Sequence, residues 1–340
     1  MKIKYLFVAV AGASLTLSLA PFDWWWTAII AMAALAASMN TASSKQGFLL
    51  SWCFGSASFA TGVSWVYVAM HDFGETSAIL ATLMTGVFCI GLGLVPALLG
   101  YCYCRWVRDG NAGRTLGFAA LWVLSEWLRG WVFTGFPWLY LGYGHLHTAM
   151  AGWSPVVGVY GLSFWVALSG SAIALCITAP KALKRHGYAS LAACVALFGL
   201  GFSLQKHEWT TADSKAPLRI GAVQSNISQE KKWAYTQYWA TLEQYDNASE
   251  ELWADSDLVI WPEAAIPALY HNALSYFDYI AERAEANNSA LITGIPTRFD
   301  ENMYNSVMVI SGGEGIYHKQ RLVPFGEYVP LSHYIRGVIK

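Results

Sequence analysis

The chain has 340 residues, of which 55% are hydrophobic and only 13% are charged, with a formal net charge of −1. Soluble domains usually carry about 25% charged residues, so the composition excludes a protein that is soluble over its whole length. The near-zero net charge and the lack of a basic face exclude nucleic acid as the expected partner. Long apolar runs fill residues 1–205, and an ordinary soluble composition follows over 206–340. We therefore predict two domains with these bounds.

Seven apolar stretches in the first domain are candidates for membrane-spanning helices, because a span needs about 20 mostly apolar residues. The first two are the shortest. Lys2 and Lys4 precede the first stretch, so residues 1–20 would also fit a signal peptide. We favour a span, since further apolar stretches follow and no cleavage pattern stands before Pro21. The stretches are 3–19, 24–39, 48–70, 78–106, 116–133, 156–178 and 188–204.

The lysines and arginines between these stretches indicate their orientation, because such residues gather in cytoplasmic loops. They occupy the N-terminus and alternate loops, and the intervening loops contain none. Seven spans then place residues 206–340 outside the cytoplasm. We expect a multi-pass protein of the bacterial inner membrane with a periplasmic second domain. The residues are Lys2, Lys4, Lys45, Arg105, Arg108, Arg114, Lys181, Lys184 and Arg185.

Two charged residues lie within the fifth stretch. Glu126 and Arg129 are three residues apart and so share one helix face. An unpaired charge in the middle of a membrane costs roughly 2.5–3.5 kcal/mol. We expect either a structural ion pair or the polar lining of a lipid-facing cavity, and the sequence favours neither. His145 and His147 have a spacing that can bind a metal, but no nearby Cys, Asp or Glu completes a set, so neither a metal nor a cofactor is predicted.

The second domain predicts an α/β fold with a mixed sheet and helices on its outer faces. In such sheets, chemistry takes place beyond the carboxyl ends of strands, and Glu263 directly follows a strand that stops at Pro262. A lone glutamate there is usually an ordinary surface residue. Lys319 and Glu327, which follow in apolar surroundings, make a site more credible. Strands are expected over 217–227, 257–261, 290–297 and 305–310, helices over 231–252 and 273–286, and a turn over 312–315.

Several motifs together resemble one family along the whole chain and in order. They are "APFDWWW" (20–26), "EWLRGWVFTGFPWLYLGYG" (126–144), "KKWAY" (231–235), "WPEAAIP" (261–267), "TGIP" (293–296), "YNS" (304–306) and "KQRLVPFGEYVP" (319–330). The chain is similar to the apolipoprotein N-acyltransferases, a membrane branch of the nitrilase or carbon–nitrogen hydrolase superfamily.

That resemblance implies a multi-span helical membrane domain followed by a nitrilase-like α-β-β-α sandwich. It implies an acyltransferase that moves an acyl chain from a phospholipid, typically phosphatidylethanolamine, to the N-terminal amine of a diacylglyceryl-cysteine apolipoprotein. The acyl group passes through a cysteine thioester in a ping-pong reaction. Glu263 would be the general base and Lys319 the cation that stabilises the oxyanion. Glu327 and Trp233 would support the site, with Trp233 contacting lipid.

The sequence departs from the family pattern at the nucleophile. The family's cysteine follows the lysine loop, whereas this sequence has none after Cys194. We therefore expect the 340 residues to hold only the first part of the nitrilase-like domain, without its C-terminal part or a final span, and to be inactive alone. A membrane-tethered nitrilase-type amidase, with water as acceptor, is the nearest alternative. A non-catalytic membrane protein such as a transporter is a third, disfavoured because the stretches carry few ionisable residues.

The orientation can be tested with a reporter that is active only outside the cytoplasm. We expect activity from a fusion after residue 206 and none from a fusion after Lys184, because the sixth and seventh stretches flank that basic loop. The reverse pattern would contradict the seven-span arrangement.

Overall fold

The computed structural model describes residues 2–74, 76–110, 112–212, 216–300 and 302–322. The chain divides into two compact units. We call Met1–Thr210 the helical unit and Thr211–Lys340 the sheet unit, and each is described by itself.

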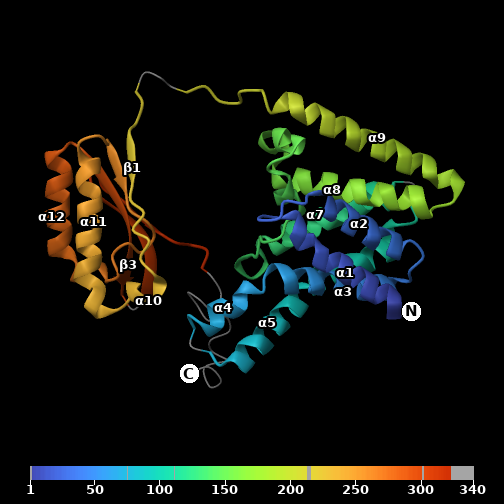
Figure 1. The fold of residues 1–340 in the computed structure, drawn as a ribbon, viewed down its shortest axis with the longest axis horizontal. Helices are drawn as coiled ribbons and strands as arrows, with labels where there is room; N and C mark the ends of the chain where they lie inside the picture. The colour runs from blue at the N-terminus through green and yellow to red at the C-terminus, as the bar shows by residue number, and fades with distance from the viewer. Residues whose placement is uncertain (1, 75, 111, 213–215, 301, 323–340) are drawn as a thin grey trace. The chain divides into compact units, whose positions relative to one another are not determined.

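The helical unit consists of helices joined by turns and by longer segments, of which the one between α7 and α8 is the longest (Figure 1). The helices are α1 (Lys2–Ser14), α2 (Trp26–Met39), α3 (Ser44–Gly62), α4 (Trp65–His71), α5 (Ala78–Leu92), α6 (Leu94–Cys102), α7 (Phe118–Arg129), α8 (Ser154–Thr178) and α9 (Lys181–Leu204).

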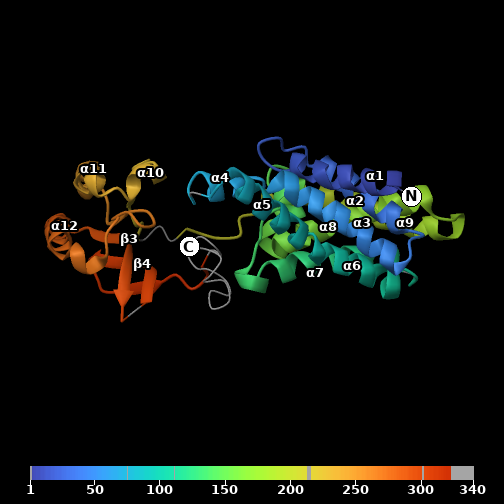
Figure 2. The same cartoon turned by 90° about the horizontal axis from the view of Figure 1, so that it is seen from below.

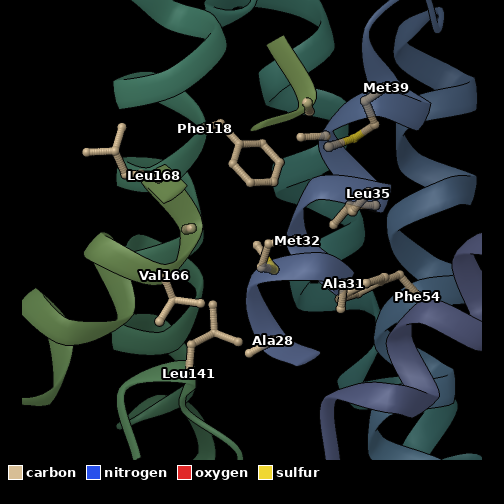
Figure 3. Close-up of a cluster of buried hydrophobic side chains, with 14 of the residues drawn as sticks. Ala28, Ala31, Met32, Leu35, Met39, Phe54, Phe118, Leu141, Val166 and Leu168 are labelled. Carbon is tan, nitrogen blue, oxygen red and sulfur yellow. The ribbon is translucent and has the colours of Figure 1, made fainter. Parts of the chain in front are cut away.

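The core of the helical unit lies around α2 and α8. Met32, Leu35 and Met39 of α2 are fully buried, and their side chains lie among those of Phe54 from α3 and Phe118 from α7 (Figure 3). These two helices are therefore surrounded by protein, whereas α5 and α9 expose most of their apolar side chains.

Two glycines allow the inner helices to approach closely. A Cβ at Gly170 of α8 would lie 2.6 Å from the Cβ of Met32 on α2, and a Cβ at Gly12 of α1 would lie 2.1 Å from the main-chain oxygen of Phe54 on α3. Small residues at such crossings let helices pack backbone to backbone inside membranes.

Helical segments occupy all seven of the apolar stretches, but they differ in length from the expectation. Among the described residues, three helical stretches are long and apolar enough to cross a membrane: Ala78–Val107, Ala149–Thr178 and Lys181–Leu204. A fourth is possible if Ser44–Gly62 and Trp65–His71, bent by 58° to each other, form one span. The seven-span count therefore stays a prediction.

The fifth stretch shows why apolar sequence did not give a full-length helix. Helix α7 ends at Arg129, and Phe133, Thr134 and Gly135 adopt positive φ angles of 53°, 74° and 93°. Right-handed helix is impossible with these angles. The apolar residues after Gly130 therefore form an irregular segment.

The sheet unit has one five-stranded sheet within the described residues, in the order β1-β2-β3-β4-β5. Strands β1, β2 and β3 are parallel, whereas β4 is antiparallel to both β3 and β5; Figure 2 shows β3 and β4 side by side. The strands are β1 (Ile220–Ala222), β2 (Leu258–Ile260), β3 (Ala290–Phe299), β4 (Asn302–Ser311) and β5 (Ile316–His318).

Helices α11 (Tyr238–Trp253) and α12 (Leu274–Ala286) lie side by side on one side of the strands (Figure 1). Their link includes Arg283 of α12, whose Nη1 lies 2.7 Å from an oxygen of Asp246 on α11. The predicted mixed sheet is confirmed. The expected two-sheet sandwich stays a prediction, since the described residues form a single sheet.

One predicted helix is interrupted. The expectation was a continuous helix over 231–252, but the short helix α10 (Gln229–Lys232) stops before Trp233, and Ala234 is extended with φ −72° and ψ 123°. A regular helix resumes only at Tyr238. This break leaves Lys232 at the end of a helical turn.

Candidate functional site

The candidate site lies at the carboxyl end of β2. Trp261, the first residue after the strand, is only 2% exposed, and its Nε1 donates a hydrogen bond of 2.9 Å to Ser249 Oγ on α11. Its ring also lies 5.0 Å from that of Tyr245. The buried tryptophan fixes the end of the strand, and therefore the point from which Pro262 and Glu263 leave the sheet.

A tight turn follows immediately. The Ala265 main-chain N–H donates to the Pro262 oxygen at 3.2 Å and to the Gly294 oxygen of β3 at 3.0 Å. Between them, Ala264 has a φ of 47°, a left-handed conformation that costs a residue with a Cβ about 1–2 kcal/mol. The neighbouring structure therefore holds a strained turn, which is a common feature of functional sites.

Gly294 of β3 lies directly against the backbone of this turn. A Cβ there would lie 2.6 Å from the nitrogen of Ala264, the Cα of Glu263 and the oxygen of Pro262. Only glycine allows the backbone of β3 to lie this close to the turn.

The Glu263 carboxylate contacts two residues from the far strands. Lys319 Nζ lies 3.2 Å from Glu263 Oε1, and Asn305 Nδ2 donates a hydrogen bond to the same oxygen. The Glu263 side chain is 62% exposed and that of Lys319 is 32% exposed. Exposed ion pairs stabilise folds by only about 0–1 kcal/mol, so the contribution of this pair to folding is small.

The sheet brings these residues together although they are far apart in sequence. Lys319 follows the end of β5, and its main-chain N–H donates to the Asn305 oxygen of β4 at 2.8 Å. Strand β5 runs parallel to β3 because both are antiparallel to β4. Its carboxyl end therefore lies at the same edge of the sheet as that of β2.

A second lysine contacts Glu263 through the main chain. Lys232 Nζ at the end of α10 donates a hydrogen bond of 3.1 Å to the main-chain oxygen of Glu263. Burial lowers the pKa of Lys232, and the Glu263 carboxylate partly opposes that shift. Glu263 thus contacts one lysine at its side chain and another at its backbone.

The other predicted site residues are distributed differently. Trp233 is 54% exposed and adjoins the Lys232 contact. Glu327 lies outside the described residues. The six cysteines all belong to the helical unit, and none is in a disulfide. Within the described ranges, no three His, Cys, Asp or Glu side chains gather as a metal-binding set.

Glu126 is fully buried in the helical unit and has its own hydrogen-bond partners. Its Oε1 accepts hydrogen bonds from Trp122 Nε1 at 3.0 Å and from the Leu141 main-chain N–H at 2.9 Å. Among the residues that the structure describes, Glu126 and Arg129 each have other hydrogen-bond partners, and the expected mutual pair stays a prediction.

Arg129 instead contacts the irregular segment that follows α7. Its Nη1 donates to the main-chain oxygens of Phe136, at 2.9 Å, and Trp138. The guanidinium also lies 4.8 Å from the ring centre of Tyr140. Glu126 and Arg129 therefore bind residues 136–141 at separate points, while the lipid-facing cavity stays a prediction.

The geometry can be compared with known proteins. The family described as Carbon-nitrogen hydrolase matches residues 219–340, which contain the sheet and its Glu–Lys pair. The sheet unit is thus of the carbon–nitrogen hydrolase class. The family described as Apolipoprotein N-acyltransferase N-terminal domain matches residues 11–172 of the helical unit.

Whole-chain relatives agree with both matches. The chain is 39% identical to the apolipoprotein N-acyltransferase of Azotobacter vinelandii, 41% identical to that of Pseudomonas aeruginosa and 38% identical to that of Pseudomonas putida. Each alignment covers 98% of this chain, and 66%, 66% and 67% of the three relatives. The chain belongs to the apolipoprotein N-acyltransferase family. It spans about two thirds of the length of these relatives.

Sequence reasoning missed three residues of the site. Asn305 lies in the "YNS" motif, which carried the family resemblance but had no role assigned. Lys232 lies in "KKWAY" and Gly294 in "TGIP". Each of the three belongs to a motif that carries the family resemblance. Those motifs are the sequence signal for the three residues, but their contacts can be seen only in the folded chain.

The close packing at Gly294 predicts a loss of stability when a side chain is added there. We expect Gly294→Ala to lower the free energy of unfolding of the sheet unit by about 1–3 kcal/mol, because the added methyl group overpacks the turn. Hydrogen exchange of the β2 and β3 amides in the whole chain measures this. The matched control is Gly315→Ala, whose Cβ would meet only Val309 Cγ2 at 3.7 Å. Equal stability of the two variants would contradict the close packing.

Proposed function

We propose that this chain carries the general base and the oxyanion-stabilising cation of a lipoprotein N-acyltransferase. The observation that carries the proposal is the Glu263–Lys319 contact of 3.2 Å at the carboxyl edge of a carbon–nitrogen hydrolase sheet. The apolar helices on the same chain support a substrate that resides in a membrane. The relatives are apolipoprotein N-acyltransferases by name, which supports a lipoprotein as the acceptor of an acyl group.

In the proposed reaction, Glu263 accepts the proton of a cysteine thiol, whose usual pKa of about 8.5 leaves only a few per cent thiolate at neutral pH. The thiolate attacks the ester carbonyl of a phospholipid of the phosphatidylethanolamine type. Lys319 stabilises the negative charge that develops on the carbonyl oxygen, and Glu263 returns the proton to the departing lysophospholipid alkoxide. A thioester remains on the cysteine.

The second half-reaction uses the same two residues. The N-terminal amine of a diacylglyceryl-cysteine apolipoprotein attacks the thioester, Glu263 takes the proton of that amine, and Lys319 again stabilises the oxyanion. The thiolate leaves and takes the proton back from Glu263, which restores the thiol and the carboxylate and completes a ping-pong cycle. Water as acceptor in place of the amine would give the alternative amidase-type hydrolysis. Amide product and free fatty acid therefore distinguish the two functions.

The proposed setting follows the distribution of charge in the sequence. Seven spans with the basic loops in the cytoplasm put the sheet unit in the periplasm and the protein in the bacterial inner membrane. Supporting roles are proposed for Trp233, as a lipid-contacting side chain, and for Glu327. The exposure of Trp233, with Tyr235 and Trp239 also exposed nearby, suits a lipid ligand.

The roles of the pair are tested by substitution in the complete product of the gene. We expect Glu263→Gln and Lys319→Met each to lower transfer of a labelled acyl group by about 10²-fold or more, because a general base contributes roughly 10²–10⁴-fold and an oxyanion donor a comparable factor. Glu314→Gln, in the exposed turn between β4 and β5, is the control and should transfer label normally. Undiminished transfer by Glu263→Gln would refute the proposal.

The cysteines allow a separate test on the 340-residue polypeptide. Because all six belong to the helical unit, we assign the nucleophile to none of them. Incubation of this polypeptide with a phospholipid carrying a labelled acyl chain should leave no hydroxylamine-sensitive label. The assignment would fail if label appeared and was lost when one of the six was replaced by alanine.

A further inference from the structure

Lys232 contacts the main chain of Glu263. Its Nζ donates to the Glu263 carbonyl oxygen at 3.1 Å, and this oxygen belongs to the peptide that joins Glu263 to Ala264. That peptide is the middle one of the turn closed by the hydrogen bond of 3.2 Å from Ala265 to Pro262. Lys232 therefore contacts the segment that sets the direction of the Glu263 side chain.

The turn needs such a contact because of Ala264. With φ at 47°, Ala264 keeps the preceding peptide in an orientation that residues other than glycine rarely adopt. If that peptide rotated, Ala264 would return to an ordinary conformation and the Glu263 carbonyl would point elsewhere. A charged donor on this oxygen opposes the rotation, since hydrogen bonds with an ionised partner are the stronger kind.

We propose that Lys232 is a positioning residue for Glu263. It fixes the backbone from which the base projects, while Asn305 and Lys319 fix the carboxylate oxygen. This inference rests on the proposed role of Glu263 as general base. It goes beyond that role because it assigns a task to a third charged residue, which lies on helix α10 and not on a strand of the sheet.

The local chemistry favours positioning over binding. The Lys232 ammonium is partly buried; burial lowers its pKa, and the Glu263 carboxylate partly opposes that shift. Lys231, its neighbour in the chain, is exposed. The two adjacent lysines thus form a natural pair for comparison, one in contact with the turn and the other at the surface.

The test compares Lys232→Met with Lys231→Met in the complete product of the gene. We expect Lys232→Met to lower kcat about 10–100-fold with KM for the phospholipid changed less than twofold, because a displacement of about 1 Å at the reacting group costs roughly 10²-fold. Lys232→Arg keeps a cationic donor and should recover most of the activity. Lys231→Met should behave like the unchanged protein.

A second readout is independent of activity and reports the turn itself. Hydrogen exchange of the Ala265 amide should be at least tenfold faster in Lys232→Met than in Lys231→Met, while the amides of β3 and β4 exchange as before. Unchanged exchange at Ala265 would overturn the inference even if activity fell.

The remaining outcomes also decide the matter. A raised KM with normal kcat would show that Lys232 binds substrate, and equal kinetics of the two methionine variants would show that it does not position the base. Both overturn the inference and leave the proposed function intact. If Glu263→Gln retains full activity, the proposed function itself fails. The two failures are therefore distinguishable.

Discussion

The strained turn at the end of β2 is the constraint on which the sheet unit's site depends. Glu263 must leave the sheet at a fixed angle, and Ala264 adopts a φ of 47° to allow it. Three neighbouring residues stabilise this turn. Trp261 anchors the strand before it, Gly294 leaves room for its backbone, and Lys232 contacts its central peptide. Without these contacts, a left-handed alanine would relax, because its conformation is unfavourable by itself.

The position of Glu263 could be predicted from sequence, and the structure shows why. A strand ended by proline puts the next residue at the carboxyl edge of a parallel sheet, where chemistry is common. Lys319 could be placed there too, as the end of another strand. The sequence could not place Asn305, because it lies on antiparallel β4, and its register opposite Pro296 depends on the β3–β4 hairpin. The contact of Lys232 could not be predicted either, because a side chain that donates to a main-chain oxygen produces no sequence pattern. The sequence also predicts a continuous helix where the chain breaks before Tyr238.

The helical unit shows a different limit of the same reasoning. Hydropathy located the helical segments, because apolar residues must be removed from water in any arrangement. It did not locate their ends: α7, for example, ends at Arg129, and Phe133 and Thr134 beyond it have positive φ angles. The spacing of Glu126 and Arg129 predicted a shared face but not their partners. Arg129 instead donates to main-chain oxygens beyond α7, which became available because the chain leaves the helix there.

The arrangement of the two lysines explains how one carboxylate can serve both halves of the proposed reaction. Lys319 contacts Glu263 Oε1 while the carboxylate is charged. When Glu263 takes a proton, that attraction disappears, and the Lys319 ammonium can then stabilise the oxyanion that forms in the same step. The net charge of the site stays constant through the transfer, so no net charge has to be created at the site in this step. Such an exchange of partners by Lys319 requires that Glu263 keep its place when Lys319 turns away. A separate contact of Lys232 with the backbone meets that requirement, because the Glu263 carbonyl oxygen does not change its charge when the side chain is protonated.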